Sequence, residues 1–430
     1  LLICATVVIS SIATAQESTS SPYSFYGLGS LKFKGTVENR SMGGISVYSD
    51  SIHINLRNPA SYTGTNLAFY NNEARPVIFA LGTSFSSTTI ETSTASDSYS
   101  NSAIDYLAVA LPLNKFGLGF GVLPYSSVGY NLQSRNENND LQYRYRGEGG
   151  INRAFVGLGY QVSKNLKIGV DTQYNFGNIS NTSIAFGYND FGELLQFQSR
   201  EVNRSDLGGF SFNFGTIFNK KINNSIELMV AASYSPEASI VSKNQSEFST
   251  IVIDSDQTEF IVDSSIVDLE SDDLAETSLI LPSKTNFGIG IGKPRKWFVG
   301  VDYTFLEASR FSNRFVEIDN TTFEDATSLS IGGFFIPKYD SFGNYWKRIV
   351  YRTGLRLEQT GLVVNNESIE EFGISFGVGI PVGRFFSNAN LAFEWGQRGT
   401  TASNLVKETF FNINISLSLN DRWFEKRKFN

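Results

Sequence analysis

The chain has 430 residues, and its 35 Lys and Arg against 42 Asp and Glu give a formal charge of −7. This acidic balance argues against nucleic acid as a partner, because binding to phosphates needs clustered basic side chains. Hydrophobic residues make up 41% and charged residues only 18%, which excludes a disordered chain. The 36 Phe and 38 Gly beside only 2 Met favour strands and turns over helices.

The chain contains a single His, His53, and a single Cys, Cys4. A zinc site built from His and Cys, or a Cys-His catalytic pair, is therefore excluded. A Ser-His-Asp triad would have only His53 available as its base. We therefore predict that the protein is not an enzyme and that it has no catalytic residue, no metal site and no cofactor.

The first predicted segment is an export signal at residues 1–15, which carry no charge and are rich in Leu, Ile, Ala and Val. They end in Ala13-Thr14-Ala15, the small-x-small pattern of a signal peptidase site. A signal peptide has a basic region before its apolar stretch. No basic residue precedes the apolar stretch here, so we expect that the start of the precursor is missing from the sequence. We expect a mature chain that begins near Gln16 and lacks cysteine, and no later stretch is apolar enough for a membrane-spanning helix.

Beyond about residue 71 the sequence alternates between apolar and other residues with a period of two, which is typical of strands. The clearest case places one set of apolar side chains on one face of a strand: Phe411, Ile413, Ile415, Leu417 and Leu419. The set between them is polar: Asn412, Asn414, Ser416 and Ser418. We expect the apolar set to face lipid and the polar set to face a lumen.

Fourteen such segments are predicted, near 74–91, 102–113, 115–131, 150–162, 165–182, 206–219, 222–235, 284–292, 295–307, 327–336, 347–358, 369–382, 385–397 and 406–419. Most are ten or more residues long, as a tilted strand needs to cross a bilayer. Connections after even-numbered strands are mostly short, while the largest gaps, near 183–205 and 236–283, follow odd-numbered strands. This asymmetry predicts an all-β, 14-stranded antiparallel transmembrane barrel of the bacterial outer membrane, with short periplasmic turns and long external loops.

Short motifs recur in a fixed order along the chain. The segment before the first strand contains Ser21-Pro22-Tyr23-Ser24, Gly27-Leu28-Gly29, Arg40-Ser41-Met42-Gly43-Gly44 and Asn58-Pro59-Ala60-Ser61. Later motifs are Leu281-Pro282-Ser283, Val301-Asp302-Tyr303-Thr304 and Tyr351-Arg352-Thr353-Gly354. In this order they resemble the FadL/TodX family of outer-membrane transporters for hydrophobic compounds. PorV-like barrels, which are similar to that family, act as accessory subunits of secretion or assembly machines.

The resemblance implies an N-terminal hatch inside the barrel lumen, here residues 16–70, followed by the barrel at 71–430. Gly43, Gly44, Asn58, Pro59 and Ala60 are the candidate hatch residues. Pro59 fixes its own φ and disfavours helix at Asn58, whose side chain is suited to cap the turn. A segment this rich in turn residues cannot lie in lipid, because its backbone N–H and C=O groups would lack hydrogen-bond partners there.

A kinked third strand opens a side window from lumen to lipid in the family that the chain resembles. Pro124 and Gly129 are the candidate kink residues here, because proline cannot donate a hydrogen bond to a strand ladder. The alternative is a proline near the loop end of an ordinary strand. No motif allows the ligand-binding residues of the family to be placed.

The fourth external loop, near residues 244–283, contains ten acidic residues and no basic one. It lacks the spacing of a calcium loop, so we interpret it as a solvated loop. Interspersed apolar residues, among them Ile251, Ile253, Phe260 and Ile261, predict a hairpin of its own.

Two functions remain open at this point. The first is passage of hydrophobic small molecules, fatty-acid-like or aromatic, through a plugged barrel in the outer membrane. Its expected partners are outer-membrane lipid and a hydrophobic ligand. The alternative is a non-transporting structural or accessory subunit that binds protein partners in a membrane complex. A continuous lumen pocket favours the first, and an occluded lumen with exposed apolar patches favours the second.

Overall fold

The structure is a computed structural model that describes residues 19–50, 52–63, 77–136, 138–311, 315, 321–382 and 387–421. The predicted signal peptide lies outside the described residues, as do residues 16–18, 51 and 64–70 of the predicted hatch. Within the described part of the chain, no helix is long and apolar enough to cross a membrane.

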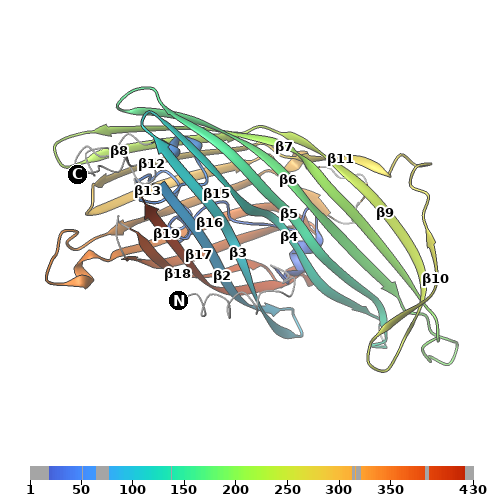
Figure 1. The fold of residues 1–430 in the computed structure, drawn as a ribbon. Coiled ribbons are helices and arrows are strands. Elements are labelled where there is room, and N and C mark those ends of the chain that lie inside the picture. Colours follow the sequence, from blue (N-terminus) through green and yellow to red (C-terminus); the bar gives the residue numbers. More distant parts are fainter. Residues whose placement is uncertain are drawn as a thin grey trace, which may run out of the picture.

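The strands form one closed antiparallel barrel of fourteen strand lines (Figure 1). The first six lines are single strands: β2 (Val77–Glu91), β3 (Ser96–Leu113), β4 (Phe116–Arg135), β5 (Leu141–Gln161), β6 (Leu166–Ala185) and β7 (Gln198–Lys221). The seventh combines β8 (Glu227–Ser235) and β9 (Ala238–Ile253), which both pair with β7. The eighth combines β10 (Glu259–Ile266), β11 (Glu276–Leu281) and β12 (Lys284–Lys293).

The remaining six lines complete and close the barrel. They are β13 (Trp297–Leu306), β14 (Thr321–Phe323) with β15 (Ala326–Phe335), β16 (Val350–Val364), β17 (Glu367–Pro381), β18 (Asn388–Gly399) and β19 (Lys407–Asp421). β19 pairs with β2 along its whole length, from Lys407 opposite Glu91 to Asp421 opposite Val77. The predicted 14-stranded antiparallel barrel is therefore confirmed.

Strands extend into both of the segments predicted as the longest loops. β6 continues to Ala185 and β7 begins at Gln198, so that residues 186–197 connect them. Most of residues 236–283 belongs to β9, β10 and β11, and the predicted hairpin is confirmed by the pairing of Glu259 with Ile253. The strands on this side of the barrel consequently extend beyond their neighbours at the end opposite the short turns (Figure 1).

The two faces of β19 separate apolar from polar side chains as predicted. Ile415 is 51% exposed on the outer surface, whereas Asn414 and Ser416 are buried on the inner one. Phe411, Leu417 and Leu419 are likewise exposed. Since most barrel strands alternate in this way, the outside of the barrel carries a broad apolar surface and the inside a largely polar one.

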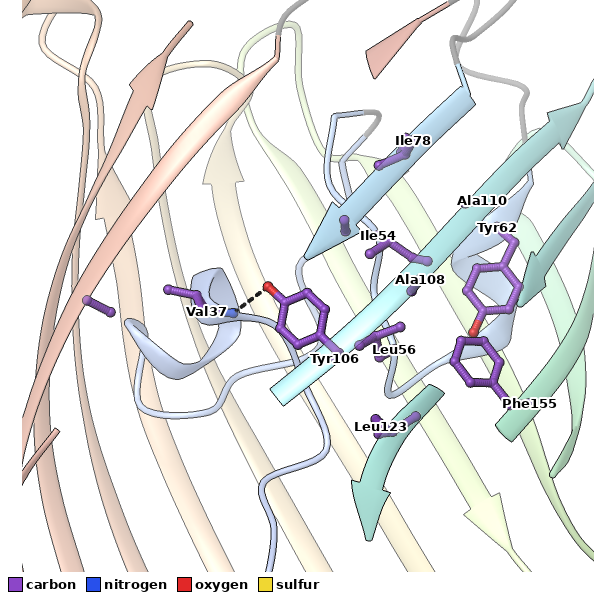
Figure 2. Close-up of a cluster of buried hydrophobic side chains, with 12 residues drawn as sticks. Val37, Ile54, Leu56, Tyr62, Ile78, Tyr106, Ala108, Ala110, Leu123 and Phe155 are labelled. Carbon is purple, nitrogen blue, oxygen red and sulfur yellow. Dashed lines mark hydrogen bonds between the residues drawn. The ribbon is translucent and has the colours of Figure 1, made fainter. Parts of the chain in front are cut away.

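The described residues before β2, 19–50 and 52–63, form an N-terminal segment that packs within the ring of strands (Figure 1). It contains η1 (Pro22–Phe25), β1 (Ser30–Leu31), α2 (Val37–Arg40) and η2 (Pro59–Tyr62). The other short helices among the described residues are η4 (Ala308–Arg310), η5 (Tyr345–Arg348) and η6 (Ala402–Asn404). Figure 2 shows Ile54, Leu56 and Tyr62 of this N-terminal segment in one buried cluster with barrel residues such as Phe155. The core of the molecule therefore lies between the segment and the barrel wall.

Candidate functional site

Asn58, Pro59 and Ala60 form the start of η2 and fix it to the barrel wall. The Asn58 side chain accepts a hydrogen bond from the Ala60 N–H (3.1 Å), so the expected capping of this turn is present. Its Nδ2 also donates to the carbonyls of Thr216 and Ala232, both at 3.0 Å. One side chain thereby caps the start of η2 and binds two adjacent strands, β7 and β8.

Glycine at position 215 makes this approach possible. A Cβ atom built there would lie 2.1 Å from Asn58 Oδ1, which is too close for any real contact. A Cβ atom at Gly169 would likewise collide with the backbone of Pro59 and Ala60, and one at Gly117 would collide with the carbonyl of Tyr62. The wall is thus lined with glycine where η2 lies against it.

Gly43 and Gly44 form a second close contact, against β16 and β17. Both have positive φ values, +71° and +95°, which favour glycine. The Gly43 N–H donates to Ser375 Oγ at 2.9 Å, and a Cβ at Gly354 would lie 2.1 Å from the Met42 carbonyl carbon. Ser375 stands in a Gly-x-Ser-x-Gly run, but in the middle of strand β17 rather than at a turn into a helix, so this run is not a nucleophile elbow.

Buried polar side chains complete the attachment of the segment. Ser46 donates to Asp302 Oδ2 through both its N–H and its hydroxyl, each at 2.6 Å. Glu38 accepts from Asn390 Nδ2 of β18 at 2.6 Å and from the hydroxyl of Ser416 of β19 at 3.2 Å. The segment is therefore hydrogen-bonded to strands that lie well apart around the barrel.

Pro124 and Gly129 lie where β4 separates from β3. Pairing between the two strands ends at Leu107 opposite Val122, and the register of β4 against β5 shifts between Pro124 and Ser126. Beyond this point β1 takes the place of β3, pairing Ser30 with Ser127. The hydroxyl of Ser24 contacts both the N–H and the carbonyl of Gly129, at 3.1 and 2.9 Å.

An apolar pocket of about 120 Å³ lies beside the place where β4 separates from β3, which we call the β3–β4 seam. Its walls come from the N-terminal segment, including Tyr26 and Leu28, and from Phe311, Phe323 and Leu362. The aromatic rings of Phe311 and Phe323 meet edge to face, with their centroids 4.9 Å apart. The pocket is of a size and composition suited to a small apolar group.

A larger, strongly charged cavity of about 240 Å³ adjoins the apolar pocket, and the two share Ser30, Leu31, Leu306, Glu358 and Arg398 among their lining residues. Lys32 and Lys34 also line this charged cavity, and burial lowers the pKa of both amines. Together the two spaces form one amphipathic site between the N-terminal segment and the wall.

Ion pairs line the wall of the charged cavity on β16 to β19. Arg356 contacts Glu371 at 2.5 Å and Glu394 at 3.0 Å, and Arg398 pairs with the other carboxylate oxygen of Glu371. Glu408 lies 3.8 Å from Arg398 and accepts from the hydroxyl of Ser21 at 2.5 Å. Sequence reasoning missed this network, although its charges occupy inward positions of adjacent strands.

His53, the single histidine, lies at a third cavity of about 190 Å³ near the short turns. Its Nδ1 is 2.8 Å from Asp50 Oδ2, and its Nε2 is 3.8 Å from Glu38 Oε1. Burial alone would lower the pKa of His53, but the two carboxylates outweigh burial and hold the pKa above its usual value. The same pairing holds the pKa of Asp50 below its usual range.

Comparison with solved structures places the fold among hydrophobic-compound channels. The Pseudomonas putida toluene transporter TodX matches with a TM-score of 0.59 and 15% identity, covering 91% of this chain and 100% of its own. The Ralstonia pickettii toluene transporter TbuX matches with a TM-score of 0.57, 14% identity and coverage of 90% and 99%. A Pseudomonas aeruginosa FadL homologue matches with a TM-score of 0.55 and 11% identity, covering 91% of this chain and 99% of its own.

These likenesses confirm the predicted FadL/TodX resemblance at the level of the fold. No curated protein matches the chain. A family model described as BamG matches residues 1–430, the whole chain.

Proposed function

The chain belongs to the BamG family, and we propose that it is an outer-membrane barrel that passes small molecules with an apolar body and a polar end. One observation carries this proposal: the apolar pocket beside the β3–β4 seam shares five lining residues with the charged cavity and so lies directly against it. Burial of an apolar group in the pocket is favourable, and the charged cavity supplies partners for a polar end. The fold that the chain shares with toluene transporters supports the same function.

The path that we propose begins at the seam and passes the N-terminal segment, which acts as the hatch. Pro124 and Gly129 would form the lateral opening, and residues near Ser24 and Ser30 would have to move away from β4. Gly43, Gly44, Asn58, Pro59 and Ala60 would hold the hatch against the wall. No catalytic step is needed, because a concentration gradient drives the passage.

Filling the apolar pocket tests this function. Ala308 is buried in its wall, so Ala308→Phe should occupy the space that a ligand needs. We expect the wild type to raise uptake of radiolabelled decanoate or toluene into bacterial cells that lack their own channel for these compounds, and the variant to lose most of that gain. Ala95→Phe, at an exposed turn, is the matched control. Equal uptake by all three proteins and by cells without them would contradict transport.

A second function is favoured by a different observation, the contact of the N-terminal segment with wall glycines. Because Gly117, Gly169, Gly215 and Gly354 leave no space for a Cβ, the segment fills this part of the lumen closely. Such a segment suits a closed barrel that serves as a structural or accessory subunit and binds protein partners. A Ser46→Cys/Asp302→Cys disulfide would lock the segment in place. If oxidation abolishes uptake and a reductant restores it, the segment acts as a moving hatch. If the locked protein still supports the activity of its host complex, the second function is favoured.

A further inference from the structure

Strand β10 forms a free sheet edge at the end of the barrel opposite the short turns. It pairs on one side with β9, from Glu259 opposite Ile253 to Ile266 opposite Glu247. Among the described residues, no strand pairs with its other side. β10 lies at the outer margin of the extended strands (Figure 1).

The backbone of this edge is available for further pairing. The N–H of Val267 donates to the Ser246 carbonyl at 2.9 Å, which marks that position as a hydrogen-bonded pair with β9. By the alternation of an antiparallel ladder, the N–H groups of Ser264 and Ile266 then point away from β9. β10 contains neither Lys nor Pro, which commonly protect edges, although its register shifts between Ile261 and Asp263.

Apolar side chains stand exposed on both faces of β10. Phe260 is 53% exposed, Ile261 55%, Val262 56% and Ile266 81%. Phe248 on the neighbouring strand is 50% exposed, and it lies opposite Ser265. An added strand would cover part of this surface as well as pairing the edge.

The charge around the edge selects the kind of partner. Seven exposed acidic residues lie in or beside β10 and β11: Asp256, Asp263, Asp268, Glu270, Asp272, Asp273 and Glu276. Glu259 is different, because it is already paired with Arg146 and Arg200 at 3.5 Å. Pairing of two copies through β10 would bring acidic segments together, and phosphate head groups of lipids would be repelled.

We propose that β10 is a docking edge to which an extended strand of another protein, with alternating apolar and basic residues, adds to the sheet. Backbone hydrogen bonds supply the pairing, and the basic side chains meet the acidic segment. The proposal does not depend on passage of a solute through the lumen.

Two synthetic ten-residue peptides test the proposal on the full-length protein in nanodiscs. Both alternate Val or Thr with a charged residue, which is Lys in one peptide and Glu in the other. We expect saturable binding of the Lys peptide alone, with slowed hydrogen exchange at the amides of Ser264 and Ile266. The Glu peptide should not bind.

The variant Ser264→Pro removes an N–H that points to the free edge but keeps the pairing with β9. It should weaken binding of the Lys peptide about fivefold, the effect of one hydrogen bond. Ser255→Pro, in the turn before β10, is the matched control and should leave binding unchanged. Asp263→Lys should weaken binding without relying on proline.

Three results would overturn the proposal. Equal binding of both peptides would show non-specific association, and unchanged binding by Ser264→Pro and Asp263→Lys would place the peptide elsewhere. Dimers that form through β10 in sedimentation experiments, and that Ser264→Pro dissociates, would assign the edge to a second copy.

Discussion

Ser46 and Asp302 join the N-terminal segment to β13 through two hydrogen bonds on one carboxylate oxygen. Asp302 is 1% exposed and Ser46 is 2% exposed. Because the carboxylate accepts from both the backbone and the side chain of Ser46, it fixes the path of the chain as well as one side chain.

Asp302→Ala should loosen the N-terminal segment, because it leaves the buried N–H of Ser46 without its acceptor, while the Ser46 hydroxyl keeps Asn286 Oδ1 at 3.1 Å. We expect a loss of stability of about 1–3 kcal/mol, the cost of an unsatisfied buried group. Limited proteolysis at Arg40 and Arg57, with the heat stability of the folded barrel, measures the effect. Asp206→Ala, at an exposed position, is the control. Equal cleavage of both variants would show that this contact does not hold the segment.

Gly354→Ala should displace the turn at Met42 and Gly43, since its Cβ would lie 2.1 Å from a backbone atom. If the segment closes the lumen, ion conductance of the variant in planar bilayers should rise above that of the wild type. Gly343→Ala, where nothing lies within 4 Å of the Cβ, should behave as the wild type. A folded Gly354→Ala barrel with wild-type conductance would argue against closure by this segment.

Ile415→Arg should destabilise the barrel by about 2–4 kcal/mol, the cost of a cation on the lipid face near the middle of a bilayer. Asn412→Arg is the inward control, because Asn412 lines the charged cavity beside Glu394. Asn414 also faces inward, but it is unsuitable as the control, because it is fully buried and its side chain accepts a hydrogen bond from Arg40 at 2.9 Å. Unfolding in urea in the presence of lipid vesicles compares the two. A greater loss for Asn412→Arg would reverse the assignment of the faces.

The pair of His53 and Asp50 predicts how the stability of the segment depends on pH. The pKa of His53 is raised in the folded state. Its contribution to stability is therefore complete below about pH 6.5, the unfolded pKa, and is lost as the pH rises through the folded pKa. The pKa of Asp50 is lowered, so its contribution to stability is present above about pH 3.9, the unfolded pKa, and is lost as the pH falls through the folded pKa. Glu38 and Arg352 also face His53.

Proteolysis of the segment at pH 6 and pH 9 should therefore show weaker protection at the higher pH. His53→Gln should remove this difference while leaving the barrel folded. An unchanged difference in the variant would assign the pH dependence to other groups.

The strands could be predicted from sequence because period-two alternation reports directly which side of a strand is buried. The motif Asn58-Pro59-Ala60 likewise predicted a capped turn, since its chemistry is local. The network of Arg356, Glu371 and Arg398 could not be predicted in this way. Glu371 lies directly opposite Arg398 in the ladder between β17 and β18, and this register is known only once the sheet is assembled.

The contact between Ser21 and Glu408 joins residues 387 positions apart in the sequence. The N-terminal segment therefore finds this partner only when β19 is in place. Because β19 also closes the barrel onto β2, closure of the barrel and attachment of the segment through Glu408 depend on the same strand. Both are contacts of high sequence separation, whose loop-closure entropy must be overcome before they contribute to stability.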